Sequence, residues 1–536
     1  MTKGRSNDAV VATIHVRYED NVDGAANVET AISEAGYGWF NVLLLAAALP
    51  AAWSGIFDTT TTAFVLISAE CDLGLTTFRK GLLAATPFLG IILASLLWDR
   101  VAPYVATRNL FIVGLLADTV LNVISSALDS YYAFLAVKLV IGLLVGGPFS
   151  MVTNYLSEFH SAEYKAGFAR WSGLVMNAGI IFPAVMAYFI VPLSLDVEIF
   201  FRRYNAWRIY LLACSVVPLV GILTACMLPH SPKHLVESGR PDEALNLLRR
   251  MYSLNTRKSM DSFPIRTLVG CRKPRRPFVE ANSEQIRLAW YNARLLLSGR
   301  YLRTFAHLGF LQFGSSLAFN TMRLWVPHTF MIISNFDRES WTLDRPPLLA
   351  DLLHRRYTVT LQQYSDCPDL YGFCVRWQVN GLIYLKSTII AISTVFFAFL
   401  AGQITGTDFR KKTILLAAFL ITAGSGLGIS WVPEAPNILT LAAAIIVASK
   451  IASNIVAAVS GQVIPVPFRA TGLSLLTNLG NLGAILGNLI LSAILDAEPA
   501  AAFVGLGVLL LVCFILSLVL PEPAKASPKA AVDGNA

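Results

Sequence analysis

Apolar stretches of about 20 residues recur along this chain about a dozen times, and one basic segment divides them into two blocks. An α-helix rises about 1.5 Å per residue, so about 20 apolar residues cross the ~30 Å hydrocarbon core of a bilayer. The dividing segment runs from His230 to Arg303 and carries fifteen Lys or Arg against six Asp or Glu. Two blocks of six helices around a cytoplasmic linker are typical of many secondary transporters.

The pattern therefore predicts twelve membrane-spanning helices. Those of the first block are expected at residues 40–68, 80–98, 108–129, 131–155, 168–193 and 207–229. Those of the second block are expected at residues 304–333, 381–403, 412–432, 436–464, 469–495 and 500–521. The chain then divides into an N-terminal tail (1–37), a six-helix bundle (38–229), a linker (230–303), a second bundle (304–521) with a long loop (334–380), and a C-terminal tail (522–536).

Composition excludes an ordinary soluble domain. The mean hydropathy is +0.59 and 14% of the residues are charged, whereas about 25% would be charged in a soluble domain. The net charge of +8 lies mostly in the linker and in short loops, where positive charge retained in the cytoplasm sets the topology of a membrane protein. No basic stripe with stacking aromatics accompanies it, so we expect the lipid bilayer and no nucleic acid as a partner.

The charge distribution also predicts the orientation of the chain. Basic residues gather in the connections that would be cytoplasmic if both termini were cytoplasmic, at Arg108, Lys165, 410–412 and Arg469. The loop 334–380 has mixed charge without a basic excess, as expected of the opposite side. It also contains Cys367 and Cys374, which could form a disulfide in an oxidising compartment. Plasma membrane and intracellular vesicle membrane both remain open as locations.

Within the linker, the run that starts at Pro241 predicts a helix. Pro241, Asp242 and Glu243 suit the first turn of a helix, and Arg249 and Arg250 suit its last turn.

Ionisable residues inside the spans are the main functional candidates, because a charge in the hydrocarbon region is costly. Asp58 lies in the middle of span one and precedes four threonines, 59–62, so this face is expected to point to the bundle interior. We interpret Asp58 as a carboxylate for substrate recognition or proton coupling. The alternative is that Asp58 is a structural partner for a cation of a neighbouring helix. Lys450 and Asn454 lie in span ten, where a Lys could hold an anion or pair with a carboxylate.

Span seven is interrupted by Arg323 and Trp325, which we expect to contact substrate or to gate. Pro327 follows and would free a backbone carbonyl, and bent polar helices commonly line cavities. Glycines of spans four and eleven predict close helix packing: Gly142, Gly146, Gly147, Gly480, Gly483 and Gly487. The sequence contains no nucleophile elbow, phosphate-cradling glycine loop or metal motif, so we expect neither an enzyme nor a cofactor or metal.

Several short motifs then resemble the synaptic vesicle glycoprotein 2 and related-protein branch of the major facilitator superfamily. They are residues 36–40 (GYGWF), 64–70 (FVLISAE) with 80–81, 155–159 (YLSEF) with Trp171, 207–208 (WR), and 231–240 (SPKHLVESGR) with 242–244. This set covers most of residues 36–260, and only a general superfamily pattern extends over the second half. The resemblance implies an all-α fold of twelve helices in two pseudo-symmetric six-helix bundles.

The sequence departs from the superfamily at the loops that normally latch the cytoplasmic side. Asp99 and Arg100 come early in the loop between spans two and three, and Pro103 to Thr107 replace the usual later residues, although Arg108 is retained. The second-half copy of this loop motif, which precedes Arg410, also departs from the superfamily pattern. Lys138 stands where members commonly carry Arg. From the resemblance we expect a cytoplasmic gate held by charge pairing, formed by Asp99, Arg100, Arg108, Lys138, Glu158, Arg208 and Arg410.

Two functions from different classes remain open at this point. The first is alternating-access transport of a small polar or ionic organic solute, with protons or another ion as the coupling partner, in a cavity lined by spans one, four, seven and ten. The second is a transporter-shaped protein with a binding, vesicle-trafficking or regulatory role. The eroded motifs favour the second, and the retained intramembrane charges favour the first. A channel has less support, because no ring of like charges is visible.

Overall fold

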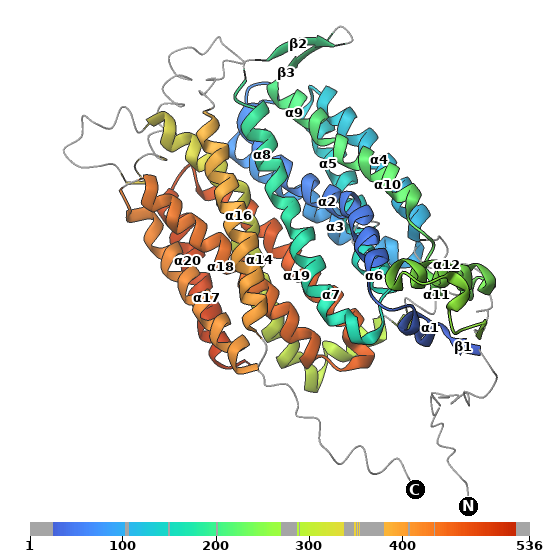
Figure 1. The fold of residues 1–536 in the computed structure, drawn as a ribbon. Helices are drawn as coiled ribbons and strands as arrows, with labels where there is room; N and C mark the ends of the chain where they lie inside the picture. Colours follow the sequence, from blue (N-terminus) through green and yellow to red (C-terminus); the bar gives the residue numbers. More distant parts are fainter. Residues whose placement is uncertain are drawn as a thin grey trace, which may run out of the picture.

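The computed structural model describes residues 25–101, 107–147, 151–193, 195–199, 202–269, 287–288, 290–336, 348–349, 351, 353, 380–405, 408–433 and 435–520. Its helices are grouped into two bundles that lie side by side, with the N-terminal half in blue to green and the C-terminal half in yellow to red (Figure 1). The predicted pair of Cys367 and Cys374 lies outside the described residues.

The N-terminal half contains six helical crossings. The first three are continuous: α2 (Trp39–Ser68), α3 (Thr77–Val101) and α4 (Thr107–Ala127). The fourth is α5 (Tyr131–Gly146), followed by the short α6 (Val152–Ser157). The fifth is formed by α7 (Ala162–Asn177), a 3-10 turn η2 (Ala178–Ile180) and α8 (Ile181–Ile190), and the sixth by α9 (Ala206–Cys214) and α10 (Val216–Met227).

The C-terminal half repeats this count. Its crossings are α14 (Gly299–Phe336), α16 (Gly381–Ile404), α17 (Asp408–Gly428) with η5 (Ile429–Trp431), α18 (Ala435–Val463), α19 (Arg469–Ile494) and α20 (Pro499–Leu518), with η6 (Val466–Phe468) before α19. Most of these helices begin and end close to the predicted spans. Span five begins earlier than expected, at Ala162 instead of residue 168, because its first turns are polar and carry no hydropathy signal.

Ten helices of the described chain are long and apolar enough to cross a membrane. Two crossings of the fold are not among the ten. The described part of α5 is apolar but has only 16 residues. The 38-residue α14 is diluted by polar residues such as Gln312, Asn320 and Arg323. Both exceptions lie between apolar neighbours in the same bundle, so the predicted count of twelve crossings holds.

The two halves meet along four helices of the N-terminal half. Helix α19 packs against α3, α14 packs against α2, and α16 packs against both α8 and α7. Within each half the closest approaches use glycine, as the sequence predicted. A Cβ atom at Gly142 of α5 would overlap the backbone of Pro87 and Gly90 in α3, and one at Gly483 of α19 would overlap the backbone of Phe313 in α14. Both pairs need glycine because the backbones themselves are in contact.

A small layer covers one end of the N-terminal half, which we call the linker end (Figure 1). It contains β1 (Ala25–Asn27), α1 (Val28–Ala35), α11 (Pro232–Glu237), α12 (Pro241–Thr256), η3 (Met260–Ser262) and β4 (Thr267–Val269). Strand β1 pairs with β4 in parallel, with Ala25 opposite Thr267. The helix predicted from Pro241 is α12, and Asp242 and Glu243 stand in its first turn. Residues 25–35, expected within a tail, belong to this layer.

The linker layer has its own apolar core and is attached to α2. Ala31, Ile32, Leu248 and Met251 are buried in that core. Phe40 and Leu247 pack against this core and also against the core of the N-terminal bundle. Asn255 of α12 reinforces the attachment: its Nδ2 donates to the carbonyl of Gly36 (2.9 Å) and to Asn41 Oδ1 (3.1 Å), and its Oδ1 accepts from Phe40 N (3.0 Å).

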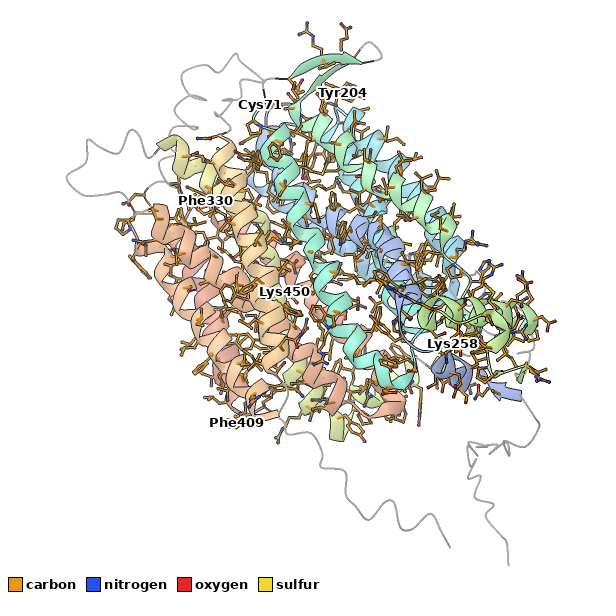
Figure 2. All side chains as sticks on the ribbon, in the orientation of Figure 1. Cys71, Tyr204, Lys258, Phe330, Phe409 and Lys450 are labelled. Atoms are coloured by element: carbon orange, nitrogen blue, oxygen red, sulfur yellow. The ribbon has the colours of Figure 1, made fainter. Side chains whose placement is uncertain are left out.

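The opposite end of the bundle, the hairpin end, carries β2 (Asp196–Ile199) and β3 (Arg202–Asn205), which pair antiparallel (Figure 1). Tyr204 and Cys71 mark this end, and Lys258 and Phe409 mark the linker end (Figure 2). Cys71 is disulfide-bonded.

Candidate functional site

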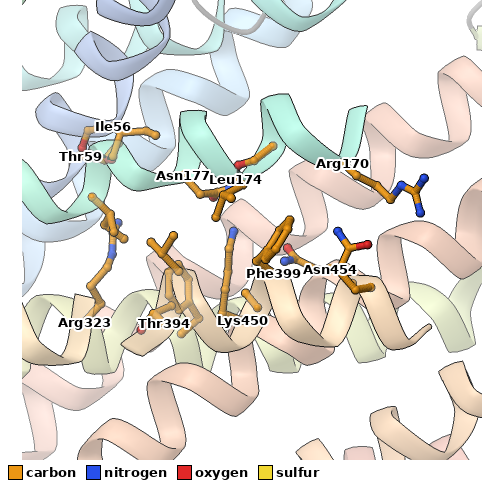
Figure 3. A pocket seen from close by; sticks show the side chains of 17 residues that line it. Ile56, Thr59, Arg170, Leu174, Asn177, Arg323, Thr394, Phe399, Lys450 and Asn454 are labelled. Carbon is orange, nitrogen blue, oxygen red and sulfur yellow. Dashed lines mark hydrogen bonds between the residues drawn. The ribbon is translucent and has the colours of Figure 1, made fainter. Parts of the chain in front are cut away.

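A cavity of about 240 Å³ lies between the two halves. Its walls come from α2 and α7 with η2 in the N-terminal half and from α14, α16 and α18 in the C-terminal half. The side chains that line it are shown in Figure 3; they are Ile56, Thr59, Arg170, Gly173, Leu174, Asn177, Ile180, Phe319, Arg323, Thr394, Val395, Ala398, Phe399, Gly402, Gln403, Lys450 and Asn454. A smaller pocket of about 30 Å³ continues from it and shares Ile180, Arg323 and Thr394.

The cavity lies midway along the bundle and opens toward the linker end. Lys450 is roughly equidistant from the two ends in Figure 2. Arg170, in the part of the α7–α8 crossing nearer the linker end, and Gly402 and Gln403, near the end of α16, line the cavity and are exposed. Both of these parts belong to the linker end, so the opening faces that side.

At the hairpin end, side-chain contacts join the two halves above the cavity. Thr77 Oγ1 of α3 donates to Asp496 Oδ1 just after α19 (2.8 Å). Lys80 Nζ forms an ion pair with Glu70 (2.8 Å) and lies 3.0 Å from Nε2 of His328, on α14. These contacts join α3 to α14 and to the end of α19 on the hairpin side of the cavity.

Arg323 projects from α14 across the cavity toward α2 (Figure 3). Its Nη1 donates to Thr60 Oγ1 (2.8 Å) and its Nη2 to Asn320 Oδ1 (3.3 Å), while Nε is buried without a hydrogen-bond acceptor. The guanidinium also lies 5.3 Å from the centre of the Phe319 ring. All these partners are neutral, so they orient the guanidinium without neutralising its charge.

Lys450 projects from α18 toward α7, where Asn177 and Leu174 face it (Figure 3). Its Nζ lies 5.2 Å from the centre of the same Phe319 ring. The two cations therefore flank one aromatic ring and repel each other across it. Among the described residues no carboxylate lies within ion-pair distance of either cation. The described lining of the cavity also contains no Asp or Glu.

Asp58 does not line this cavity, although its neighbour Thr59 does. Its side chain is turned into the N-terminal half, where Asn122 Nδ2 donates to Asp58 Oδ1 (3.0 Å) and to Asp118 Oδ1 (2.7 Å). Lys138 of α5 interacts electrostatically with both carboxylates. All four residues are buried. Oδ2 of each carboxylate and Nζ of Lys138 have no hydrogen-bond partner among the described residues. We call these four residues the acid cluster.

The structure separates the residues predicted for substrate contact into two groups. Arg323, Lys450 and Asn454 line the cavity together. Asp58 belongs to the acid cluster behind α2, so it does not face Lys450. Trp325 is buried behind the cavity wall, where its Nε1 donates to Asn488 Oδ1 of α19 (3.0 Å) and its ring meets His328. Trp325 points away because it follows Arg323 by two positions, which is about 200° around a helix.

The structure places two of the predicted gate residues, Lys138 and Arg208, away from the linker end. Lys138 lies deep in the N-terminal half because it stands at the middle of α5, where it is part of the acid cluster. Arg208 lies at the hairpin end, since α9 begins there. Its guanidinium donates to the carbonyl of Ser126 (2.8 Å) and pairs with Asp129 (2.6 Å).

The other predicted gate residues lie at the linker end. Arg108 Nη2 donates to the carbonyl of Cys226 (2.7 Å), Glu158 caps the end of α6, and Arg410 is exposed near the start of α17. The side chains of Asp99 and Arg100 lie outside the described set. Here Lys411 Nζ donates to Gln462 Oε1 (2.8 Å).

Sequence reasoning missed several residues of the site. Asn122 was missed, yet Asp118 and Asn122 are four residues apart and so share one face of α4, a spacing visible in the sequence. Asn177 and Thr394 line the cavity without any distinguishing neighbours in the sequence. Lys80 and His328 come together from two halves of the chain, 248 residues apart, and no local signal reveals that contact.

Two family models match the chain. The model described as "Sugar (and other) transporter" matches residues 30–265, and the model described as "Major Facilitator Superfamily" matches residues 380–536. The first includes the acid cluster and the linker layer except for β1, the start of α1 and β4, and the second includes Lys450 and the wall of the cavity formed by α16 and α18. The two matches do not overlap and together cover most of the chain.

Curated relatives include two vesicle proteins of Rattus norvegicus. Synaptic vesicle glycoprotein 2B is 26% identical over 332 residues, which are 58% of this chain and 48% of that protein. Synaptic vesicle glycoprotein 2A is 29% identical over 247 residues, which are 45% of this chain and 33% of that protein. The chain therefore spans about half, or less, of the length of the relatives it matches. Since most of the aligned positions differ, these relatives indicate the family of the chain and little else about it.

Solved structures with the same fold include the xylose transporter XylE from E. coli. Its partially occluded inward-open conformation superposes with a TM-score of 0.63, at 13% identity, over 91% of this chain and 99% of that one. A crystal structure of a D-xylose–proton symporter gives a TM-score of 0.59 at 13% identity, over 90% and 98%. At this identity the likeness concerns the fold alone.

Proposed function

Because the chain belongs to the major facilitator superfamily, we propose that it is a secondary transporter that moves a small polar or ionic organic solute across a membrane by alternating access. The observation that carries the proposal is the cavity at mid-depth between the two halves, which contains two cations, opens at the linker end and is covered at the hairpin end. A solute held there passes from one side to the other if the two halves rock around it.

The acid cluster supports a coupling role for Asp58. Two carboxylates and one Lys carry a net charge of −1 when all are ionised, and one added proton makes the cluster neutral. In a region of low dielectric the neutral state is favoured, and two close carboxylates readily share a single proton. Asp58 lies on the same helix as Thr59 and Thr60, which face the cavity and Arg323. Protonation at Asp58 can therefore change how α2 meets the C-terminal half.

The proposal also gives the chain an orientation. The linker layer and both ends of the chain would be cytoplasmic, and the β2–β3 hairpin would lie on the opposite side. The basic linker at one end of the bundle and the disulfide of Cys71 at the other support this orientation.

A thiol introduced into the cavity tests alternating access even before the solute is identified. The variant Asn454→Cys, combined with Cys226→Ser, would be labelled with a membrane-impermeant maleimide in right-side-out and in inside-out vesicles, and the same background without the new thiol gives the baseline. We expect fast labelling from the linker side and slower labelling from the hairpin side. Complete labelling from the linker side with none from the other side would contradict transport and support the alternative, a transporter-shaped binding or regulatory protein.

The same assay examines coupling. Labelling from the hairpin side should depend on pH in the wild-type background and lose that dependence in Asp58→Asn. The matched control is Glu243→Gln, which removes an exposed carboxylate of the linker layer and should leave the pH dependence unchanged. An unaltered pH dependence in Asp58→Asn would remove Asp58 from the coupling role and leave the access result standing.

A further inference from the structure

Two half-buried cations face the cavity without a counter-charge in the described chain. Arg323 is held by Thr60 and Asn320, and Lys450 faces Asn177 and Leu174. Buried charges in proteins are normally paired or hydrogen-bonded to charged partners, because an uncompensated charge in a low-dielectric region is costly. The described chain supplies no such partner to either side chain.

The acid cluster does not supply the missing charge. Asp58 and Asp118 bind the same amide group of Asn122 and lie under the influence of Lys138, on the far side of α2 from the cavity. The lining of the cavity is otherwise made of neutral polar groups and of an apolar wall that includes Ile56, Phe319 and Phe399. Arg170, at the mouth, adds a third positive charge on the path from the linker end.

From this arrangement we infer that the solute taken up by the cavity is a small organic anion, a carboxylate with an apolar body, whose charged group lies between Arg323 and Lys450. The planar guanidinium of Arg323 matches a carboxylate with two parallel hydrogen bonds, and its Nε is buried and free to make one of them. The apolar body would lie against Phe319 and Phe399, and Asn177 or Asn454 could bind a hydroxyl or keto group on it.

The size of the cavity limits the solute. A volume of about 240 Å³ is below the range of about 300–1,000 Å³ that is usual for sites of drug-sized ligands. This volume suits an acid of about the size of benzoate and excludes nucleotides and peptides. The inference deepens the proposed function, since it names the substrate class of the same cavity, but binding itself does not require that the two halves alternate.

Equilibrium binding to purified full-length protein in detergent tests the inference with matched probes. Benzoate, benzamide and benzylamine share one ring and differ in charge, being negative, neutral and positive. Pyruvate and 4-hydroxybenzoate extend the anion series. Binding would be measured by calorimetry and by the rise in melting temperature, because a ligand of the folded state stabilises it by mass action. We expect at least one anion to bind at least tenfold more tightly than benzamide, and benzylamine not to bind.

Variants then assign the charge recognition. Arg323→Gln and Lys450→Gln should each weaken anion binding at least tenfold, whereas Lys450→Arg, which keeps the charge and controls for folding, should retain it. The matched control is Lys386→Gln, which removes another cation of the C-terminal half that lies over Phe330 and does not line the cavity. Binding of benzamide or benzylamine in preference to every anion, binding unaffected in both Gln variants, or no binding by any anion to folded wild-type protein would overturn the inference.

The binding and access experiments can fail separately. Anion binding together with one-sided labelling of Asn454→Cys would keep the substrate class and reject transport. Two-sided labelling without anion binding would keep transport and reject the substrate class.

Discussion

The two halves of the molecule hold their intramembrane charges in opposite ways. The N-terminal half gathers two acids, an amide and one Lys into a cluster in which the charges compensate one another to within a single proton. The C-terminal half presents Arg323 and Lys450 to a cavity and leaves both without an acidic partner in the described chain. A compensated cluster is suited to storing or releasing a proton, and an uncompensated pair is suited to binding an anion.

This comparison indicates that two similar six-helix bundles are suited to different tasks, the N-terminal one to holding a proton and the C-terminal one to binding an anion. The helices that carry the two sets, α2 with α14 and α5 with α18, occupy corresponding places in the two halves. Arg323 connects the sets, because it reaches Thr60 on the helix of Asp58. The two sets are thus connected through α2, without a direct ion pair between them among the described residues.

The largest expected effect is on stability, and it should differ in sign between the halves. Lys138→Met leaves two buried carboxylates without their cation, so we expect a loss of about 3–5 kcal/mol in the free energy of unfolding. Lys450→Met removes a half-buried charge that has no acidic partner in the described chain, so we expect no loss or a gain in stability. Both would be measured by thermal unfolding of purified protein in detergent.

The double variant Lys138→Met with Asp58→Asn provides the internal control. It restores the balance of charge in the acid cluster, so its melting temperature should recover much of what Lys138→Met loses. Equal losses in Lys138→Met and Lys450→Met would show that the two halves do not differ as described.

A smaller effect is expected from packing, and here the halves should agree. Gly142→Ala places a methyl group on the carbonyl of Pro87, and Gly483→Ala places one on the carbonyl of Phe313. Overpacking of a close contact typically costs about 1–3 kcal/mol, so both variants should lower the melting temperature by similar amounts. The control is Gly505→Ala, where a Cβ meets no atom within 4 Å. A loss confined to one half would mean that the halves differ in packing as well as in charge.

The smallest effect is expected outside the membrane. Lys233 Nζ lies 3.0 Å from Glu29 and joins α11 to α1; the hydrogen bond from Lys233, and then its charge, lowers the pKa of Glu29. A lowered pKa means that the pair stabilises the linker layer above the unfolded-state pKa of Glu and that this contribution disappears as the pH falls through the folded-state value. Because both groups are largely exposed, Glu29→Gln should cost less than about 1 kcal/mol at neutral pH.

Measuring the pH dependence of the Glu29→Gln variant checks this prediction. The difference in amide exchange of the linker layer between wild type and Glu29→Gln should be small at about pH 7 and disappear as the pH falls through the lowered folded-state pKa of Glu29. A loss as large as that of Lys138→Met would contradict the view that charges matter most where solvent cannot screen them.

Hydropathy was sufficient to predict the twelve crossings and their order, because crossing a bilayer requires a long run of apolar residues whatever the tertiary structure. The same reasoning identified Arg323, Lys450 and Asn454, since polar residues in such runs must face the protein interior. It could not tell that Asp58 faces α4 while Thr59 faces the cavity, because neighbouring positions on a helix differ by about 100° and only the packing of α2 decides which faces which partner.

The other errors have a similar cause. Lys138 and Arg208 were expected at a cytoplasmic gate from their polarity within the spans together with the resemblance, whereas the structure places Lys138 at the middle of α5 and Arg208 at the start of α9. The linker layer was only partly predictable. The run from Pro241 predicts α12 locally, but the pairing of β1 with β4 joins segments about 240 residues apart and leaves no trace in either segment.

The attachment of the linker layer has a mechanical consequence. Asn255, Phe40 and Leu247 bind it to α2, and β4 ties the chain back to β1, so the layer is rigidly fixed to the N-terminal half. If the two halves rock as proposed, the linker layer moves together with α2 and the rest of the N-terminal half. A protein bound to the linker layer would then hold the N-terminal half still, and the C-terminal half would make every movement that opens or closes the cavity.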